Sequence, residues 1–164
     1  MPKEQEIKIE MAKIINANEC NLNLCKQALA NSQVIAVPTE TVYGLAGNAL
    51  DEVAIRKIFK IKGRPLFNPL IIHTDCTKNA EKLASFNSVA RKLAENFWPG
   101  PLTIILPKKE IVPNLVTANL DSVAIRCPQN PTFLQLLKKL PFPLAAPSAN
   151  PFGYISPTLS LIHI

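Results

Sequence analysis

The 164-residue sequence has few of the groups on which covalent or metal-dependent catalysis usually depends. It has only two histidines, and its four cysteines lack C-x-x-C spacing, so neither a zinc site nor a disulfide framework is indicated. The zinc-protease motif H-E-x-x-H and the P-loop motif are both absent, and Gly44 with Gly47 is too sparse for a dinucleotide fingerprint. These absences disfavour a nucleophile-base-acid triad and leave a site that works by positioning its substrates.

Signals for membrane insertion and export are also missing. No apolar run approaches the roughly 20 residues that a membrane-spanning helix needs. The first residues do not have the pattern of a signal peptide. A reducing cytoplasm is therefore the expected location.

The composition is typical of one folded domain with a basic surface. The hydrophobic content is 48%, and charges of both signs are present. A net charge of +6 favours anionic partners such as nucleotides, nucleic acid or phosphates. The alternative is an ordinary solvated basic surface without a particular partner.

The stretch from Val34 to His73 is the most informative part of the sequence. Runs of β-branched residues bounded by proline and glycine alternate there with a helix-length pattern, which predicts a β-α-β unit. In order, we expect a strand over 34–37, a polar turn over 38–43, a helix over 51–61, a basic loop over 62–68 and a strand over 70–73. The polar groups of the turn and loop would then lie at the ends of rigid elements.

The rest of the chain continues this alternation. Further helices are expected over 21–30, 78–85, 88–98 and 130–140, and strands over 102–106, 122–126 and 144–147. Within 88–98, Val89, Leu93 and Phe97 repeat every four residues behind a capping Asn87 or Ser88. In the first helix, free Cys25 is expected to be a core residue rather than a reactive one. The pattern predicts an α/β fold with helices packed on the faces of a sheet.

Lys62 and Arg64 are candidate anion ligands. Two residues apart in an extended loop, they can project the same way, and Pro65 biases Arg64 toward an extended backbone. A lysine point charge and an arginine fork suit phosphate and carboxylate oxygens. The alternative is that both side chains are solvated at a helix carboxyl end, where cations are favoured in any case.

Further polar residues lie at the ends of apolar strands. Arg126 would be costly to bury without an anion, so its strand should end at a site or at the surface. Ser148 and Asn150 could present two polar side chains together, or they could form a capping turn. For His73, an ordinary core or surface position is the commoner outcome. None of these residues is specific by itself.

Together, these residues belong to an ordered series of motifs. The motifs are PTETVYGL (38–45), KGRPLFNPLIIH (62–73), WPGPLT (98–103), DSVAIRCP (121–128), and APSAN (146–150) followed by ISPT (155–158). The series closely resembles the YrdC-like threonylcarbamoyl-adenylate synthases over roughly residues 12–158, and K-x-R with S-x-N is the hallmark of that family. The resemblance implies an α/β fold with a twisted, open mixed sheet, helices on its faces and a basic concave cavity.

The resemblance also implies an activity. Members of the family make L-threonylcarbamoyl-AMP from L-threonine, bicarbonate and ATP and release pyrophosphate, so they are nucleotidyltransferases with ATP as a substrate. Mg²⁺ is expected on the triphosphate, with no metal ligand from protein side chains. The product feeds N6-threonylcarbamoyl modification of adenosine 37 in tRNA. This role implies hand-off to the tRNA threonylcarbamoyltransferase complex and allows binding of tRNA or double-stranded RNA, with no membrane partner.

Residue roles follow from the positions that match the motifs. The residues implied for L-threonine are Thr41, His73, Arg126 and Ser148. The residues implied for ATP are Arg64, Asn68, Ser122, Asn150 and, as a weaker contact, Ser156. Lys62 and Arg64 would be the catalytic residues, with Lys62 against the phosphates or the carbamate, and Thr39 and Tyr43 would form walls of the site. Ser122 stands where threonine is commoner in the family, and it keeps the hydroxyl.

The two ends of the sequence carry separate expectations. Residues 1–10 lack strong periodicity and are expected to form a frayed start or a short edge strand. Residues 1–158 would form one YrdC-like domain that is incomplete at its carboxyl end, because family members continue through further secondary structure. The last six residues, LSLIHI (159–164), match the translation of a transposon end used in sequencing-library preparation. We interpret them as an artefact, with a short genuine apolar tail as the alternative.

Two other functions remain open at this point. A basic concave domain could hold double-stranded RNA or tRNA without catalysis, and its binding would then be salt-sensitive and independent of ATP turnover. The YrdC-like domain of hydrogenase-maturation carbamoyltransferases uses carbamoyl phosphate instead. Those proteins carry acylphosphatase and zinc-finger-like segments, which this sequence does not contain. The synthase is the favoured interpretation.

Overall fold

The computed structural model describes residues 13–154. Its strands are β1 (Ile35–Val37), β2 (Gly44–Asn48), β3 (Ile71–His73), β4 (Thr103–Pro107), β5 (Ser122–Arg126) and β6 (Leu144–Ala145). Its helices are α1 (Glu19–Ala30), α2 (Glu52–Lys62), α3 (Thr77–Ala80), α4 (Ser88–Phe97) and α5 (Pro131–Lys138). Among these described helices, none is both long enough and apolar enough to cross a membrane.

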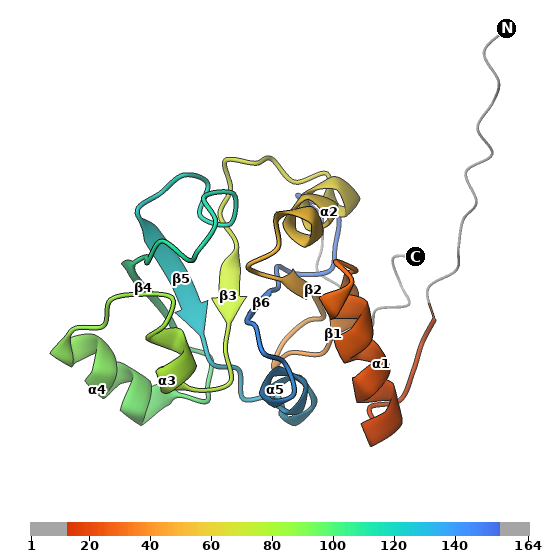
Figure 1. Cartoon of the computed structure of the whole chain (residues 1–164), viewed down its shortest axis with the longest axis horizontal. Coiled ribbons are helices and arrows are strands. Elements are labelled where there is room, and N and C mark those ends of the chain that lie inside the picture. Colours follow the sequence, from red (N-terminus) through yellow and green to blue (C-terminus); the bar gives the residue numbers. More distant parts are fainter. Residues whose placement is uncertain (1–12, 155–164) are drawn as a thin grey trace, which may run out of the picture.

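The strands form one six-stranded mixed sheet in the order β1-β2-β6-β3-β5-β4. Within residues 13–154, only β3 and β5 are parallel neighbours, and every other neighbouring pair is antiparallel. Figure 1 shows β3 and β5 side by side, with both arrowheads on the side of the sheet where α5 lies. The predicted α/β fold with an open mixed sheet is confirmed.

Two apolar cores, one on each face of the sheet, hold the helices. One core joins α2, α3 and α4 to side chains of β3, β4 and β5, including Ile72, Ile104 and Ile125. The other joins α1 and α5 to β1, β2 and β6. Strand β6 contributes to both, since Leu144 belongs to the second core and the next residue, Ala145, to the first.

The unit around α2 differs from the prediction, because the strand that precedes this helix is β2. No strand was predicted at β2 because its residues, GLAGN, are mostly glycine and alanine, which have low strand propensity. The expected strand over 34–37 is present as β1, which forms an antiparallel hairpin with β2. A Cβ at Gly47 would lie 3.1 Å from Ile58 Cδ1 and 3.4 Å from Ala54 Cβ. Glycine at this position therefore lets α2 pack closely on β2.

The helix α4 is present as predicted, but its buried face is not the apolar repeat. Val89 and Phe97 are 62% and 56% exposed, whereas Ala90 and Ala94 are buried in the core. The small alanine side chains let the helix approach the sheet, and the larger side chains lie on the solvent side. Asn87 caps the helix by accepting a hydrogen bond from Ala90 N at 2.8 Å.

The other helices confirm the predicted pattern with shifted ends. α1 begins at Glu19 because the Asn18 side chain caps it. In the same helix, Cys25 is half-buried and packs against the second core. α3 is shorter than the predicted 78–85, because the chain leaves the helix and Ala84 bridges Lys108 at the end of β4.

One face of β3, β5 and β4 is only partly covered. On β5, Val123 and Ile125 are buried in the first core, and the alternate residues face the other way. On β4, Ile105 is 69% exposed on that same side. We call this side the open face; its residues are Ile71, His73, Thr103, Ile105, Ser122, Ala124 and Arg126.

Candidate functional site

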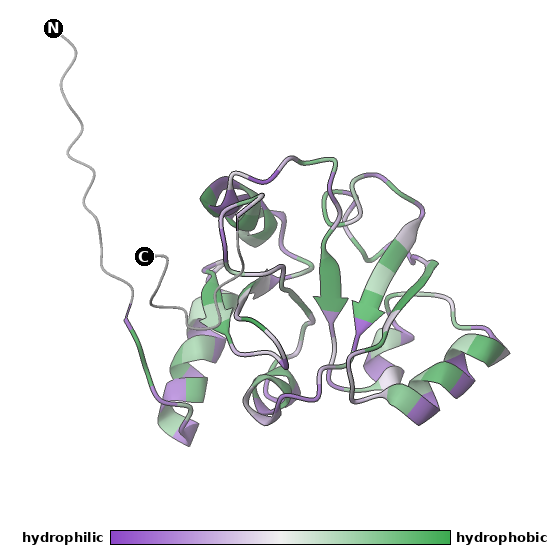
Figure 2. Ribbon diagram, turned by 180° about the vertical axis from the view of Figure 1, so that it is seen from behind, coloured by the Kyte–Doolittle hydropathy of each residue, from purple (hydrophilic) through white to green (hydrophobic). Residues whose placement is uncertain are grey.

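Two groups of polar residues lie at opposite ends of the open face. The end of α2, the loop before β3 and the segment after β6 gather near the start of β3, because β6 runs antiparallel to β3. We call four residues there the Lys62 group: Lys62, Arg64, Asn68 and Asn150. Where β3 and β5 end lies the Arg126 group: Glu40, Thr41, His73 and Arg126. Figure 2 shows β3 and β5 hydrophobic along most of their length and hydrophilic at their arrowheads.

Lys62 is a buried cation that braces the segment after β6. The residue is 4% exposed, and its Nζ donates hydrogen bonds to the carbonyl oxygens of Ser148 and Asn150. Burial, followed by the charge of Arg64, lowers the pKa of Lys62 to about 8. Lys62 therefore still carries its charge at neutral pH.

The prediction that Lys62 and Arg64 share an extended loop is wrong. Lys62 is the last residue of α2, and the chain turns at Gly63, whose φ of 59° is left-handed. The alternative of two solvated cations at a helix end is also wrong, because Lys62 is buried. The K-x-R spacing thus places Lys62 against the S-A-N segment and Arg64 directly after the helix cap at Gly63.

Arg64 lies against Asn68, its partner in the same motif. Its Nη2 donates to Asn68 Oδ1 at 2.7 Å, and its Nε donates to the Asn68 carbonyl at 3.2 Å. The guanidinium carbon lies 5.6 Å from the centroid of the Phe152 ring, which adds a cation–π contact. The structure thus holds Arg64 half-buried in a defined orientation at the end of the open face.

The S-A-N segment is a turn within the candidate site. Asn150 is 6% exposed, and its Nδ2 donates to the carbonyl of Tyr154 at 2.7 Å, which stabilises the turn. Ser148 forms an isolated antiparallel bridge with Gly44, directly after the loop over 38–43 that carries Thr41. Ser148 therefore lies between the Lys62 group and the Arg126 group.

His73 and Arg126 are direct neighbours on the parallel strands β3 and β5. His73 is 5% exposed, and its ring centroid lies 5.1 Å from that of Phe133 on α5. Within residues 13–154 its buried Nδ1 has no hydrogen-bond partner. Burial, followed by the charge of Arg126, lowers the pKa of His73 to about 4. The imidazole is therefore neutral at pH 7 and can hydrogen-bond a ligand without adding charge.

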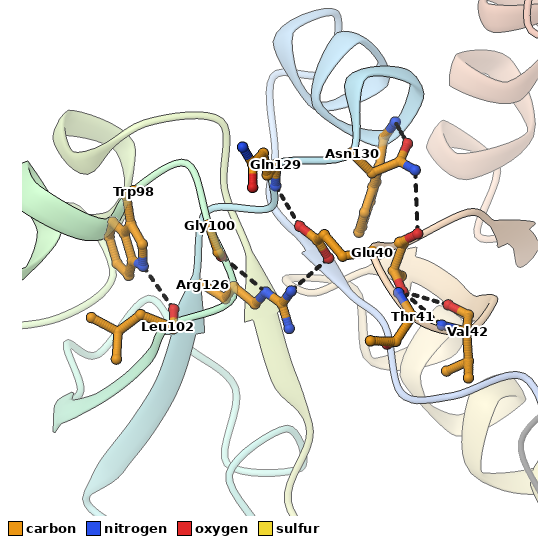
Figure 3. A network of polar contacts seen from close by, with 11 residues as sticks. Glu40, Thr41, Val42, Trp98, Gly100, Leu102, Arg126, Gln129 and Asn130 are labelled. Atoms are coloured by element: carbon orange, nitrogen blue, oxygen red, sulfur yellow. Dashed lines mark hydrogen bonds and ion pairs between the residues drawn. The ribbon is translucent and has the colours of Figure 1, made fainter.

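Arg126 has the anion that its position requires, and this anion is Glu40. The Nη2 of Arg126 lies 2.5 Å from Glu40 Oε2, and its Nε donates to the Gly100 carbonyl at 3.2 Å (Figure 3). Glu40 was not among the predicted site residues. Its signal was available, because Glu40 is the only carboxylate in the PTETVYGL motif and stands between two threonines.

The other predicted residues have separate places. Thr41 is exposed in the loop over 38–43, and its backbone N–H donates to Thr39 Oγ1 at 3.2 Å. Thr39 therefore shapes the loop in addition to its expected place in a wall. Ser122 begins β5 and lies on the open face at the end away from Arg126. Ser156 lies outside the described residues, as do residues 1–10 and the LSLIHI segment.

The structure has a separate cavity that contains none of the predicted site residues. Its volume is about 310 Å³, and its lining includes Leu50, Thr74, Asp75, Lys82 and Phe142. Across residues 13–154, no three His, Cys, Asp or Glu side chains are placed to hold a metal ion. The candidate site is therefore the open face with its two polar ends, and the basic concave cavity stays a prediction.

The fold and the site define an α/β protein whose open sheet face has cationic side chains at both ends. Residues 27–160 match the model of the Sua5/YciO/YrdC family, whose description is "Telomere recombination". The chain belongs to this family.

Its relatives include proteins named threonylcarbamoyl-AMP synthase. The one from Pyrococcus abyssi is 46% identical over 90% of this chain and 45% of its own length. The one from Bacillus subtilis is 41% identical over 92% of this chain and 44% of its own length. A crystal structure of P. abyssi Sua5 complexed with L-threonine has a TM-score of 0.83 at 46% identity, covering 89% of this chain and 43% of that chain. The chain thus spans less than half the length of these relatives.

Proposed function

We propose that this protein makes L-threonylcarbamoyl-AMP from L-threonine, bicarbonate and ATP and releases pyrophosphate. One observation carries the proposal: cations and hydrogen-bonding groups gather at both ends of one open sheet face. Support comes from relatives that bear the synthase name and from the related protein whose structure contains L-threonine.

The two groups would receive different substrates. ATP would lie at the Lys62 group, with Arg64, Asn68 and Asn150 as its contacts and with Ser122 and Ser156 as further contacts. L-Threonine would lie at the Arg126 group, with its carboxylate on Arg126 and its hydroxyl near His73 and Thr41. Ser148, which lies between the groups, would contact L-threonine where the amino acid approaches the nucleotide.

The chemistry requires no side-chain nucleophile. Bicarbonate takes up a proton and loses water to give carbon dioxide, and the amine of threonine adds to this carbon dioxide and loses a proton to give a carbamate. A carbamate oxygen then attacks the α-phosphorus of ATP as the bond to pyrophosphate breaks. Both reactants are anions, so cations and donors that are fixed before the reaction reduce their repulsion and align them. Lys62 and Arg64 would serve this role, with Lys62 against the phosphates or the carbamate.

The wider setting follows from the same proposal. Mg²⁺ would arrive on the ATP triphosphate and neutralise charge on the departing pyrophosphate. The product would pass to the tRNA threonylcarbamoyltransferase complex in the cytoplasm for modification of adenosine 37. The basic surface could also bind tRNA or double-stranded RNA, which would make binding salt-sensitive.

Pyrophosphate release by the purified protein tests the proposal. We expect release that requires L-threonine, bicarbonate and ATP together, with threonylcarbamoyl-AMP identified by mass spectrometry. ATP alone and ATP with L-serine are the controls. A folded protein that releases no pyrophosphate but binds tRNA in a salt-sensitive manner would contradict the synthase and favour the RNA-binding alternative.

A further inference from the structure

Glu40 joins parts of the chain that are far apart in the sequence. Its Oε2 contacts Arg126, which lies 86 positions away, and its Oε1 accepts a hydrogen bond from the backbone N–H of Gln129. Figure 3 shows the carboxylate between these two partners, at the connection from β5 to α5. The side chains of Glu40 and Arg126 are only 20% and 18% exposed. The pair is thus built into the site and is not a loose surface contact.

The loop over 38–43 is held to the same connection by a second contact. Asn130, the residue that caps α5, donates from Nδ2 to the Thr39 carbonyl at 3.2 Å. Thr39 Oγ1 in turn accepts from Thr41 N. The position of Thr41 therefore depends on contacts that Glu40 and Thr39 make with residues 129 and 130.

Arg126 keeps donors available although two of its nitrogens are occupied. The hydrogen bonds recorded over residues 13–154 use Nε toward Gly100 and Nη2 toward Glu40. Nη1 takes part in none of them, so it can donate to a ligand carboxylate. Since guanidinium is planar, fixing Nε and Nη2 also fixes the direction of Nη1.

Glu40 is an anion at neutral pH. Burial alone would raise its pKa, but backbone N–H donors, with Gln129 first among them, and the charge of Arg126 together lower the pKa below its ordinary value. Because Gln129 N–H holds the carboxylate independently of Arg126, Glu40 does not have to leave when a ligand reaches the guanidinium.

We propose that Glu40 is a positioning residue for the amino-acid end of the site. It aims Nη1 of Arg126 and fixes the Thr41 loop, so that the carboxylate and the hydroxyl of L-threonine meet groups already in place. This inference rests on the proposed function. The opposite role would be a carboxylate that competes with the substrate for Arg126, and removing such a competitor would tighten L-threonine binding.

Steady-state kinetics of Glu40 variants separate these roles. Glu40→Gln keeps the size and an acceptor for Gln129 N–H but points amide hydrogens at Arg126. We expect its KM for L-threonine to rise about tenfold or more, with the KM for ATP within about twofold of wild type. Glu40→Asp, which restores the charge, should recover part of the loss. Glu81→Gln, which breaks the exposed pair with Arg91, is the matched control and should change neither KM.

The outcomes distinguish this inference from the proposed function. An active wild type with an unchanged or lowered KM for L-threonine in Glu40→Gln would overturn the positioning role alone. A wild type that neither binds L-threonine by calorimetry nor releases pyrophosphate would overturn both. Amide hydrogen exchange provides a readout independent of activity. Exchange at Gln129 should quicken in Glu40→Ala and stay at the wild-type rate in Glu81→Gln.

Discussion

Burial of His73 makes the free energy of unfolding depend on pH between about pH 4 and pH 6.5, where few other groups titrate. The pKa of His73 falls from 6.5 to about 4 in the folded protein, mainly because of burial. The unfolded chain therefore binds a proton below about pH 6.5, whereas the folded protein binds it only near pH 4. Lowering the pH through this window favours unfolding. The expected loss is about 2 kcal/mol between pH 7 and pH 5.

The assay is urea unfolding followed by circular dichroism at a series of pH values. His73→Gln should flatten the fall, because it removes the group that titrates differently in the two states. The sequence has one other histidine, His163, so His163→Gln is the matched control and should retain the fall.

Equal pH dependence in His73→Gln and wild type would refute this reasoning. It would mean that His73 is hydrated or paired in solution and keeps an ordinary pKa. At pH 7 about a quarter of the molecules would then carry an imidazolium beside Arg126 at the amino-acid end of the site.

Four further variants test local parts of the structure by urea unfolding. Gly47→Ala should destabilise the protein by about 1 kcal/mol, because its Cβ would press on Ile58; an unchanged midpoint would contradict this packing. Asn87→Ala removes a helix cap and should lower the free energy of unfolding by about 1 kcal/mol. Asn130→Ala should lower it further, because Asn130 caps a helix and also donates a hydrogen bond to Thr39. Equal losses in the two variants would contradict this role of Asn130. In the wild type, the free energy of unfolding should rise by up to roughly 3 kcal/mol from pH 8 to pH 10.5, because in this range Lys62 keeps its proton in the unfolded chain and loses it in the folded protein. Lys62→Met should abolish this rise. Persistence of that rise in the variant would contradict a buried, charged Lys62.

The parts of the fold that the sequence predicts are those whose side chains alone determine the element. β5 has the predicted boundaries because the β-branched residues of SVAIR, Val123 and Ile125, alternate with its other residues over the whole strand. α2 and α4 lie within a residue of their expected ranges because capping residues precede them. β2 was not predicted. Its glycines allow α2 to pack closely, and this tertiary contact produces no strand pattern in the sequence.

The candidate site likewise has parts that the sequence predicts and parts that it does not. The motifs identify the residues that the structure gathers at the two ends of the open face. They do not reveal that Lys62 is buried, because its partners Ser148 and Asn150 lie 86 and 88 positions later. Glu40 was missed for a similar reason, since its two partners come from the distant connection between β5 and α5.

The central claim is that the two ends of the open face bind different substrates. Its most direct test is the initial rate of pyrophosphate release against each substrate for Arg64→Ala and Arg126→Ala. We predict that Arg64→Ala raises the KM for ATP about tenfold or more and leaves the KM for L-threonine near wild type, and that Arg126→Ala does the reverse. If both variants raise the same KM, or if neither KM changes, the assignment of ATP to one end and L-threonine to the other is wrong.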